Sequence, residues 1–137
     1  MALTHLLDTS VLTRLREPTV RKATEEMARR GELARAGISD LEIGFSARNA
    51  EEWDRLADAL EVFALVESTS EHVRRARQVQ RLLASRHQRG RKLPDLLVAA
   101  AAEAHSLTVL HYDADFDLIA AVTGQACRWV VPAGSID

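Results

Sequence analysis

The 137-residue sequence predicts an α/β fold in which a mostly parallel central sheet is flanked by layers of helices. Short runs of apolar and β-branched residues alternate along the chain with longer segments whose apolar residues recur at helical spacing. Strands that alternate with helices are joined by crossover connections, which make neighbouring strands parallel and place helices on the faces of the sheet. The length suits one domain of residues 1–137, and no repeat or Pro/Gly/Ser-rich linker divides the chain.

Five short segments are expected to form the sheet. The segment 62–66 (VFALV) gives a clear strand signal, because it is short and rich in β-branched and aromatic residues. Asp8 follows the first candidate strand, and Ser39 follows the second. In chain order, the predicted strands are residues 3–7, 34–38, 62–66, 107–110 and 129–131.

Six longer segments are expected to form helices. The first starts at Pro18, which suits a first helical turn, and stops at Gly31. The segment 96–104 (LLVAAAAEA) is apolar almost all round, which predicts a buried helix. The long helix at 71–88 should turn inward the residues Val73, Ala76, Val79 and Leu83. In chain order, the predicted helices are residues 18–30, 41–47, 53–60, 71–88, 96–104 and 116–122.

Composition and charge exclude several classes of protein. The chain carries 18 Lys and Arg against 20 Asp and Glu, a formal net charge of −2, which argues against an overtly basic nucleic-acid binder. Cys127 is the single cysteine, so an internal disulfide is excluded and a reducing compartment is expected. No apolar run is long enough to span a membrane, and the N-terminus lacks the basic segment of a signal peptide. We therefore expect a cytoplasmic protein with no membrane association.

Acidic residues stand close to the points where predicted strands end. Asp8 follows the first strand, Glu42 follows the second, and Asp113 and Asp115 follow the fourth, whereas Asp95 opens the alanine-rich helix. Parallel topology should bring these carboxylates to one edge of the sheet, where two of them ~6 Å apart repel by about 3 kcal/mol at an effective dielectric near 20. A bound cation would neutralise them, and oxygen-only donors favour Mg²⁺ or Mn²⁺ over Zn²⁺. The residues thus predict a divalent-metal site.

Each acid also has a structural explanation, which stays open at this point. Asp8 and Asp115 could each cap a following helix. Asp95 follows Pro94 in a first helical turn, where the helix dipole favours an anion. The segment 39–42 (SDLE) fits a capping box, in which the Glu42 side chain would reach back to the backbone amide of the N-cap residue.

Four segments taken together resemble one family. The chain contains LLDTSVL around Asp8, ISDLEIGFSAR around Glu42, KLPDLLVAAAA around Asp95 and VLHYDADFDLIA around Asp113. In this order and spacing they resemble a PIN-domain ribonuclease, and specifically a VapC-type toxin of bacterial toxin–antitoxin pairs. The resemblance covers nearly the whole chain. It implies a PIN-like three-layer sandwich and endonucleolytic cleavage of RNA that depends on Mg²⁺ or Mn²⁺.

The same resemblance implies roles for individual residues. The implied catalytic residues are Asp8, Glu42, Asp95 and Asp113. The implied metal ligands, direct or through water, are Asp8, Asp95, Asp113 and Asp115. Glu42 could instead orient or deprotonate the attacking water, since its longer side chain starts on a helix. The sequence departs from the family at His111, where many PIN domains carry Thr or Ser, although Ser10 keeps a hydroxyl near the first acid. Thr9 and His111 stay outside the predicted catalytic set.

A basic segment lies between His72 and Lys92, and no Asp or Glu interrupts it. It carries eight positive residues including Arg75, and they could form a track for the phosphates of RNA that ends beside Asp95. A solvated helix face is the alternative. Aromatic residues are only 4% of the chain, which favours recognition of RNA shape and phosphates over base stacking. The candidate RNA-binding residues are Arg74, Arg77, Arg81, Arg86, Arg89, Arg91 and Lys92.

The resemblance also implies partners. They are a structured RNA substrate (a transfer RNA or a ribosomal RNA loop), a VapB-like antitoxin that inhibits the chain, and a second copy of the chain in a homodimer. Phe45 and Trp53 are candidate linings of the groove that receives the antitoxin, although a helical apolar stripe is more often core. A non-catalytic PIN-like module that binds RNA or a protein is the alternative function, and the four intact acids argue against it.

Overall fold

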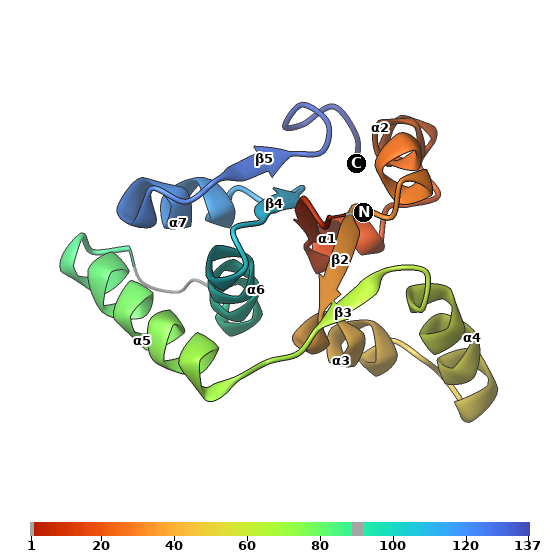
Figure 1. Ribbon diagram of the computed structural model, residues 1–137, viewed down its shortest axis with the longest axis horizontal. Coiled ribbons are helices and arrows are strands. Elements are labelled where there is room, and N and C mark those ends of the chain that lie inside the picture. Colours follow the sequence, from red (N-terminus) through yellow and green to blue (C-terminus); the bar gives the residue numbers. More distant parts are fainter. Residues whose placement is uncertain (1, 89–91) are drawn as a thin grey trace.

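The computed structural model describes residues 2–88 and 92–137, and it confirms the α/β prediction. A five-stranded sheet with the order β3-β2-β1-β4-β5 forms the centre of the molecule (Figure 1). Every strand pair in the described part of the chain is parallel. The strands are β1 (His5–Leu7), β2 (Leu33–Ala36), β3 (Ala64–Val66), β4 (Thr108–His111) and β5 (Cys127–Trp129).

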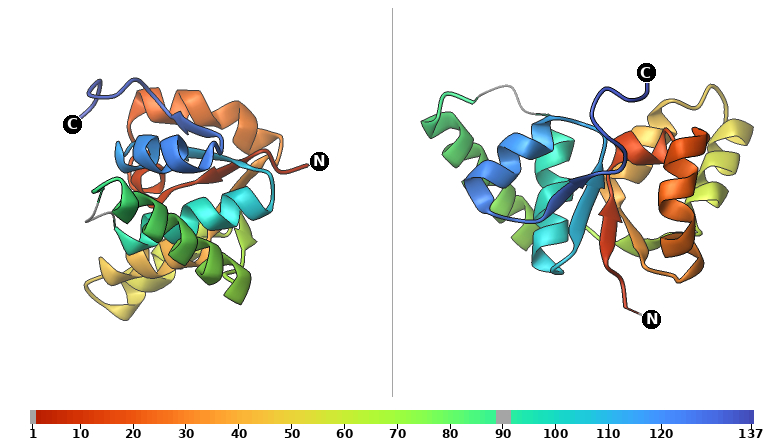
Figure 2. Two further views of the ribbon diagram at one scale, coloured as in Figure 1. Left: turned by 90° about the vertical axis from the view of Figure 1, so that its left-hand side faces the viewer. Right: turned by 90° about the horizontal axis from the view of Figure 1, so that it is seen from above.

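Helices cover both faces of this sheet and form the expected three layers. In the right panel of Figure 2, α5, α6 and α7 lie on one side of the strands, and α2 and α4 lie on the other. The described helices are α1 (Thr9–Leu12), α2 (Pro18–Arg29), α3 (Gly37–Phe45), α4 (Ala50–Leu60), α5 (Ser70–Ser85), α6 (Leu93–Ala104) and α7 (Asp115–Thr123). None of the described helices is long and apolar enough to cross a membrane.

Alternate residues of the central strands supply two separate hydrophobic cores. Leu6 and Val109 are buried in the core under α5, α6 and α7, whereas Leu7 and Leu110 are buried in the core on the opposite face. This two-sided burial is expected of a parallel sheet, because side chains on a strand point alternately to its two faces. The alanine-rich part of α6 is buried as predicted, and its small side chains allow close packing against the sheet.

Several predicted boundaries were wrong, and one of these errors bears on the candidate site. The second strand ends at Ala36 rather than at residue 38, because the chain turns into α3 at Gly37. The predicted helix 41–47 therefore starts earlier and contains Ser39, so the proposed capping box of residues 39–42 does not form. The first strand is also shorter than predicted, and the last strand lies two residues earlier.

The inward face of α5 differs from the prediction by one position. His72 is buried and Val73 is 47% exposed, while Ala76, Val79 and Leu83 are buried as expected. Positions 72, 76, 79 and 83 follow the 3.6-residue period, and Val73 lies about 100° further round the helix. Hydrophobicity predicts that Val73 is buried, but the helical period places His72 on the inward face instead.

The topology determines where a site can form. The chain leaves β1 toward β2 and β3 on one side, and it returns to β4 and β5 on the other side, so the connections diverge between β1 and β4. Ligands of open α/β sheets bind outside the carboxyl ends of the strands at such a point. In Figure 2 the arrow of β1 points toward the side on which α6 begins. Asp8 follows β1 there and donates its backbone N–H to the Leu110 carbonyl of β4 over 2.9 Å.

Candidate metal centre

A polar cavity of about 220 Å³ lies at this edge of the sheet. It collects the four predicted catalytic acids from three helices or their caps and from the end of β4. Two cations, Arg14 and Lys92, also line it. The full lining is Asp8, Thr9, Ser10, Thr13, Arg14, Glu42, Lys92, Asp95, Tyr112 and Asp113.

Asp8 is held rigidly because it caps α1. Its Oδ2 accepts hydrogen bonds from the Ser10 backbone N–H at 2.9 Å and from the Ser10 hydroxyl at 2.6 Å. The Ser10 Oγ in turn accepts the Tyr112 backbone N–H at 2.9 Å, which ties the ends of β1 and β4 together. Burial raises the pKa of Asp8, and the hydrogen bonds from Ser10 oppose that rise. The capping explanation for Asp8 is thus confirmed.

Asp95, Asp113 and Asp115 form a tight group of carboxylates. One oxygen from each lies within 4.8 Å of the others. Asp95 is 5% exposed in the first turn of α6, and its buried Oδ2 has no hydrogen-bond partner. Burial, together with the charges of Asp8 and Asp113, raises the pKa of Asp95 to about 8. A buried carboxylate oxygen without a donor is costly, and a cation bound between these carboxylates would offset that cost.

The donor set fits a hard divalent cation. All the candidate ligand atoms are carboxylate oxygens, the chemistry that Mg²⁺ and Mn²⁺ prefer, and the described residues that line the cavity include no Cys or His. The capping explanation for Asp115 is wrong, because Asp113 performs that task. The Asp113 Oδ1 accepts the Asp115 backbone N–H at 2.9 Å, and the residue before α7 is Ala114, whose side chain makes no cap.

Glu42 reaches the cavity from α3. Its Oε1 accepts a hydrogen bond from the Thr9 hydroxyl at 2.6 Å, and Thr9 Oγ1 also lies 2.8 Å from Ser39 Oγ. Since α3 begins at Gly37, the Glu42 side chain is not needed at the helix N-terminus. It is instead directed across to α1, beside Asp8. The capping-box alternative is therefore wrong, and Glu42 belongs to the acid cavity.

His111 supports the turn that carries Asp113 and does not line the cavity. The ring is fully buried, and its Nδ1 accepts the Asp113 backbone N–H at 3.2 Å. It stacks on Phe116 with ring centres 5.0 Å apart, and Trp129 packs at the same distance. Burial lowers the pKa of His111, which favours the neutral ring. These contacts hold the ring in the core and tie it to the turn that carries Asp113.

Comparison with known proteins identifies the family. The family model of the PIN domain matches residues 5–122. The chain belongs to the PIN-domain family. Ribonuclease VapC51 of Mycobacterium tuberculosis is 66% identical over 137 residues and covers 100% of both chains, which places this PIN domain among the VapC ribonucleases. Ribonuclease VapC21 of the same organism is 43% identical over 140 residues, or 98% of this chain and 99% of the relative.

Solved structures share the PIN fold at low sequence identity. The VapBC structure from Salmonella typhimurium, which was solved bound to DNA, matches with a TM-score of 0.76 at 14% identity and covers 94% of this chain and 99% of that one. VapBC2 from Rickettsia felis, solved with a promoter DNA fragment, gives 0.76 at 15% identity over 93% and 98%. At these identities the matches establish the three-layer PIN fold.

The cavity of this PIN domain also contains a positively charged side chain, Arg14, that the sequence did not suggest. The Arg14 guanidinium donates to the Ser10 carbonyl at 2.8 Å and lies 5.1 Å from the centre of the Tyr112 ring. It also pairs with Asp137 at 3.0 Å. In the segment LTRLRE nothing distinguishes Arg14 from Arg16, and only the turn after α1 directs Arg14 to the acids. The one signal that could have pointed to Arg14 is its short separation from Asp8, across the four-residue helix α1.

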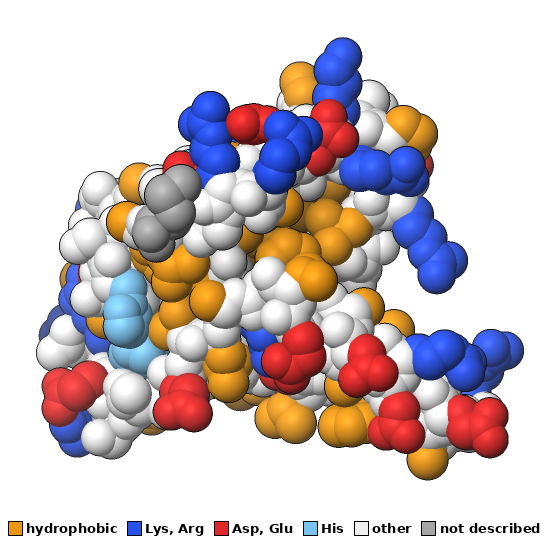
Figure 3. Space-filling model, turned by 45° about the vertical axis from the view of Figure 1, so that its right-hand side comes forward, with side chains coloured by type: hydrophobic (Ala, Val, Ile, Leu, Met, Phe, Trp, Pro, Cys, Tyr) orange, Lys and Arg blue, Asp and Glu red, His pale blue; other side chains and the backbone are white. Residues whose placement is uncertain are grey.

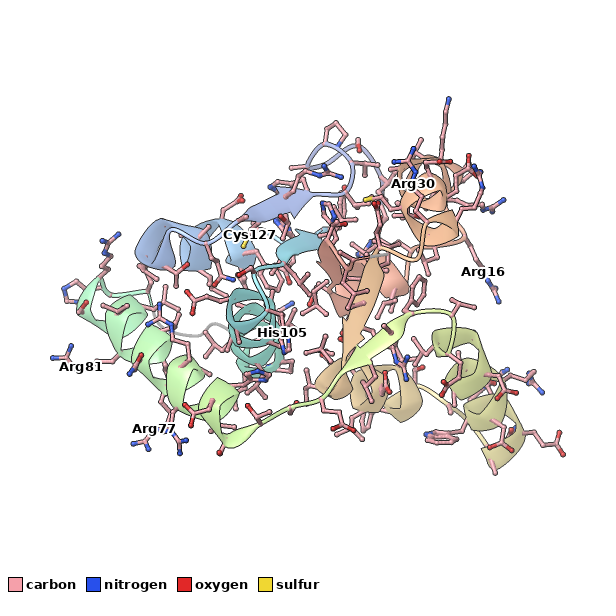
Figure 4. The ribbon with its side chains drawn as sticks, in the orientation of Figure 1. Arg16, Arg30, Arg77, Arg81, His105 and Cys127 are labelled. Carbon is pink, nitrogen blue, oxygen red and sulfur yellow. The ribbon has the colours of Figure 1, made fainter. Side chains whose placement is uncertain are left out.

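Several side chains of the basic segment between His72 and Lys92 already form ion pairs within the protein. Arg74 pairs with Glu71 on the same helix, and Arg75 pairs with Glu103 of α6 at 2.6 Å. Figure 4 shows Arg77 and Arg81 projecting from α5 away from α6. Lys92 reaches the cavity and lies 2.7 Å from Asp113. Of the other candidates, Arg86 is exposed at the end of α5, and Arg89 and Arg91 lie outside the described residues.

A second, largely apolar cavity separates α3 and α4. It measures about 150 Å³, and Trp53, which is 51% exposed, forms one wall. Trp53 packs on Gly44, where an added Cβ would lie 2.6 Å from the indole nitrogen. Phe45 does not line this cavity but is 92% exposed nearby on α3. Hydrophobic side chains also gather in the hollow between α2 and α4 (Figure 3).

Proposed function

We propose that this PIN domain is a Mg²⁺- or Mn²⁺-dependent endoribonuclease that acts as the toxin of a toxin–antitoxin pair. The observation that supports the proposal most strongly is the cavity in which Asp8, Glu42, Asp95 and Asp113 converge around an unpartnered, buried carboxylate oxygen. A relative named as a ribonuclease, with 66% identity over the full length, supports the same activity.

The chain's own residues divide the work between them. Asp8, Asp95, Asp113 and Asp115 would hold the cation, directly or through water. A cation held there would supply a water of lowered pKa and would stabilise the charge on the phosphate. Glu42 has one oxygen bound to Thr9, so its other oxygen would orient the attacking water or accept its proton. This assignment gives Glu42 the role of a base and the aspartates the role of ligands.

Positive charge beside the acids would receive the RNA. Lys92 and Arg14 line the same cavity as the four acids, which places them within reach of a phosphate at the metal. Further phosphates would meet the exposed face of α5 at Arg74, Arg77, Arg81 and Arg86. Arg89 and Arg91, which lie outside the described residues, stay candidates from the sequence. Because the sheet edge offers a shallow polar cavity rather than an aromatic platform, we expect a structured RNA recognised by shape and phosphates.

The antitoxin would occupy the apolar surface of the domain. Structures that share this fold were solved as VapBC complexes, which supports a VapB-like partner for this chain. The cavity beside Trp53 and the hollow between α2 and α4 would accept an apolar helix, while exposed Leu41 and Phe45 on α3 suit a homodimer contact. The free thiol of Cys127 is consistent with a cytoplasmic location.

Cleavage of a folded RNA tests the proposal. The purified chain should cut a hairpin RNA with Mg²⁺ or Mn²⁺, and EDTA should stop the reaction. Asp95→Asn should reduce the rate by at least about 100-fold while the far-UV CD spectrum is retained. Asp54→Asn, which changes an exposed acid on α4, is the matched control and should cleave normally. A folded Asp95→Asn protein that cleaves at the parental rate would show that the metal centre is wrongly assigned. A folded parent protein that binds RNA without cutting it would favour the non-catalytic module.

A further inference from the structure

A hydroxyl pair connects α1 to α3 beneath the acid cavity. Thr9 Oγ1 lies 2.6 Å from Glu42 Oε1 and 2.8 Å from Ser39 Oγ. Ser39 is completely buried, and Thr9 is half-buried at the cavity wall. Thr9 lies on α1, which follows β1, and Ser39 and Glu42 lie on α3, which follows β2. These contacts therefore join the carboxyl end of β1 to that of β2.

The number of protons determines which hydroxyl of this pair donates and which accepts. A threonine hydroxyl has one proton and can donate it to one acceptor only. The 2.6 Å distance to Glu42 is typical of a hydroxyl that donates to a carboxylate, so the Thr9 proton belongs to that bond. The Ser39 hydroxyl then donates to Thr9 Oγ1. The buried Ser39 proton is satisfied in this way, and Thr9 becomes a better donor because hydrogen bonds in a chain polarise one another.

Thr9 is the contact that fixes the Glu42 side chain. In the described part of the chain no Lys or Arg forms an ion pair with Glu42, and its hydrogen bond comes from Thr9. A glutamate side chain has three rotatable bonds and samples many positions unless it is held. With Oε1 bound to Thr9, the carboxylate keeps one orientation, and Oε2 is the oxygen left for the cavity.

We propose that Thr9, supported by Ser39, is a positioning residue that sets the orientation of Glu42 for the cleavage reaction. The proposal rests on the proposed nuclease function, because it assigns Glu42 a task in that reaction. Its structural part, the Ser39–Thr9–Glu42 chain, exists in the protein without any substrate. The two parts can therefore be tested separately.

Steady-state cleavage kinetics test the catalytic part. Thr9→Val keeps the β-branched shape and removes the hydroxyl, and it should lower kcat by about 10- to 100-fold with little change in KM. Thr9→Ser restores a donor and should recover most of the rate. Thr24→Val removes a threonine hydroxyl that bonds within α2, and it is the control that should leave kcat unchanged.

A double-mutant cycle shows whether Thr9 acts through Glu42. In a Glu42→Gln background, Thr9→Val should cause little further loss, because the carboxylate that Thr9 positions is already gone. Losses that multiply in the double variant would overturn the proposal, since Thr9 would then act on its own. A Thr9→Val protein with parental kcat would overturn it as well.

Carboxylate NMR of the metal-free protein tests the structural part without any cleavage. The ¹³Cδ resonance of Glu42, assigned by its loss in Glu42→Gln, should move in Thr9→Val, move less in Ser39→Ala, and stay in place in Thr24→Val. An unchanged resonance in Thr9→Val would refute the hydrogen-bond chain. If the parent protein does not cut RNA but the resonance moves as expected, the nuclease function fails while the hydrogen-bond chain stands.

Discussion

Lys92 Nζ lies 2.7 Å from Asp113 Oδ2, and this ion pair puts an ammonium group against the acid cluster. Burial alone would raise the pKa of Asp113, but hydrogen bonds from Lys92 and from the Asp115 backbone outweigh it and hold that pKa below its usual range. The hydrogen bond to Asp113 in turn raises the pKa of Lys92. Lys92 thus partly neutralises the carboxylates that would hold a metal ion.

Removal of this ammonium should separate metal binding from RNA cleavage. Lys92→Met leaves the aspartates less neutralised, so the dissociation constant for Mn²⁺ should fall by about fivefold. That change corresponds to about 1 kcal/mol, a modest value because the Lys92 side chain is 60% exposed and screened by solvent. RNA cleavage should fall at the same time, since a phosphate contact is lost. EPR titration of Mn²⁺ gives the first quantity and a hairpin-cleavage assay gives the second.

Lys92→Arg is the matched control, because it keeps the charge. It should leave the Mn²⁺ affinity close to that of the parent. Weaker Mn²⁺ binding by Lys92→Met would contradict the prediction, as it would mean that the ammonium supports the metal site rather than opposing it.

The raised pKa of Asp95 should make the stability of the metal-free protein depend on pH. Folding raises that pKa from its usual 3.8 to about 8. Between these values the folded protein holds a proton that the unfolded chain has released, so the free energy of unfolding falls as the pH rises from about 4 to 8. Asp95→Asn removes the buried charge and should stabilise the protein at pH 8 by about 1–4 kcal/mol.

Urea denaturation in EDTA across this pH range measures the effect. The advantage of Asp95→Asn over the parent should shrink steadily as the pH is lowered toward 4. Asp54→Asn serves as the control, because its carboxylate is exposed on α4. An advantage that stays constant from pH 4 to pH 8 would be inconsistent with a buried, proton-linked Asp95.

Much of this site could be predicted from the sequence, because acids that follow strands or open a helix mark the edge of a parallel sheet. Asp8, Asp95 and Asp113 are of this kind, and their joint positions along the chain predict a shared edge although each acid by itself also has a structural explanation. Glu42 was ambiguous, since the segment SDLE also fits a capping box. The helix start at Gly37 decides between the two explanations, and no strong signal in the sequence marks that start.

Other features depend on contacts between distant residues, which a pattern cannot reveal. Arg14 reaches the cavity only because α1 is four residues long, and Thr9 meets Glu42 across 33 residues of sequence. His72 was missed on α5 because hydrophobicity favours the neighbouring valine as the buried residue of the two. In each case tertiary packing, and not the local preference of the residue, determines where the side chain lies.

Arg14 should contribute to RNA binding at the cavity. Its side chain is 28% exposed and held by the Ser10 carbonyl and the Tyr112 ring, so its guanidinium is already oriented and could exchange Asp137 for a phosphate. Arg14→Ala should weaken the binding of a non-cleaved RNA and reduce the slope of log K against log salt by ~0.7–0.9. Arg16→Ala is the control, because Figure 4 shows Arg16 projecting outward into solvent. Equal slopes for the Arg14→Ala protein and the parent would exclude a phosphate contact at Arg14.

The exposed face of α5 should bind phosphates of the RNA that lie outside the acid cavity. Arg81 and Arg86 are exposed, and no ion pair involves them in the described part of the chain, whereas Arg74 and Arg75 already pair with glutamates. Changing Arg81 and Arg86 together to Ala should reduce the salt slope of RNA binding by ~1.4–1.8, at ~0.7–0.9 for each lost phosphate contact. Since both residues lie outside the acid cavity, KM should rise while kcat stays within about twofold. Arg55→Ala, an exposed arginine on α4, should change neither quantity. If the double variant keeps the parental salt slope, α5 is a solvated helix face and the RNA follows another path to Asp95.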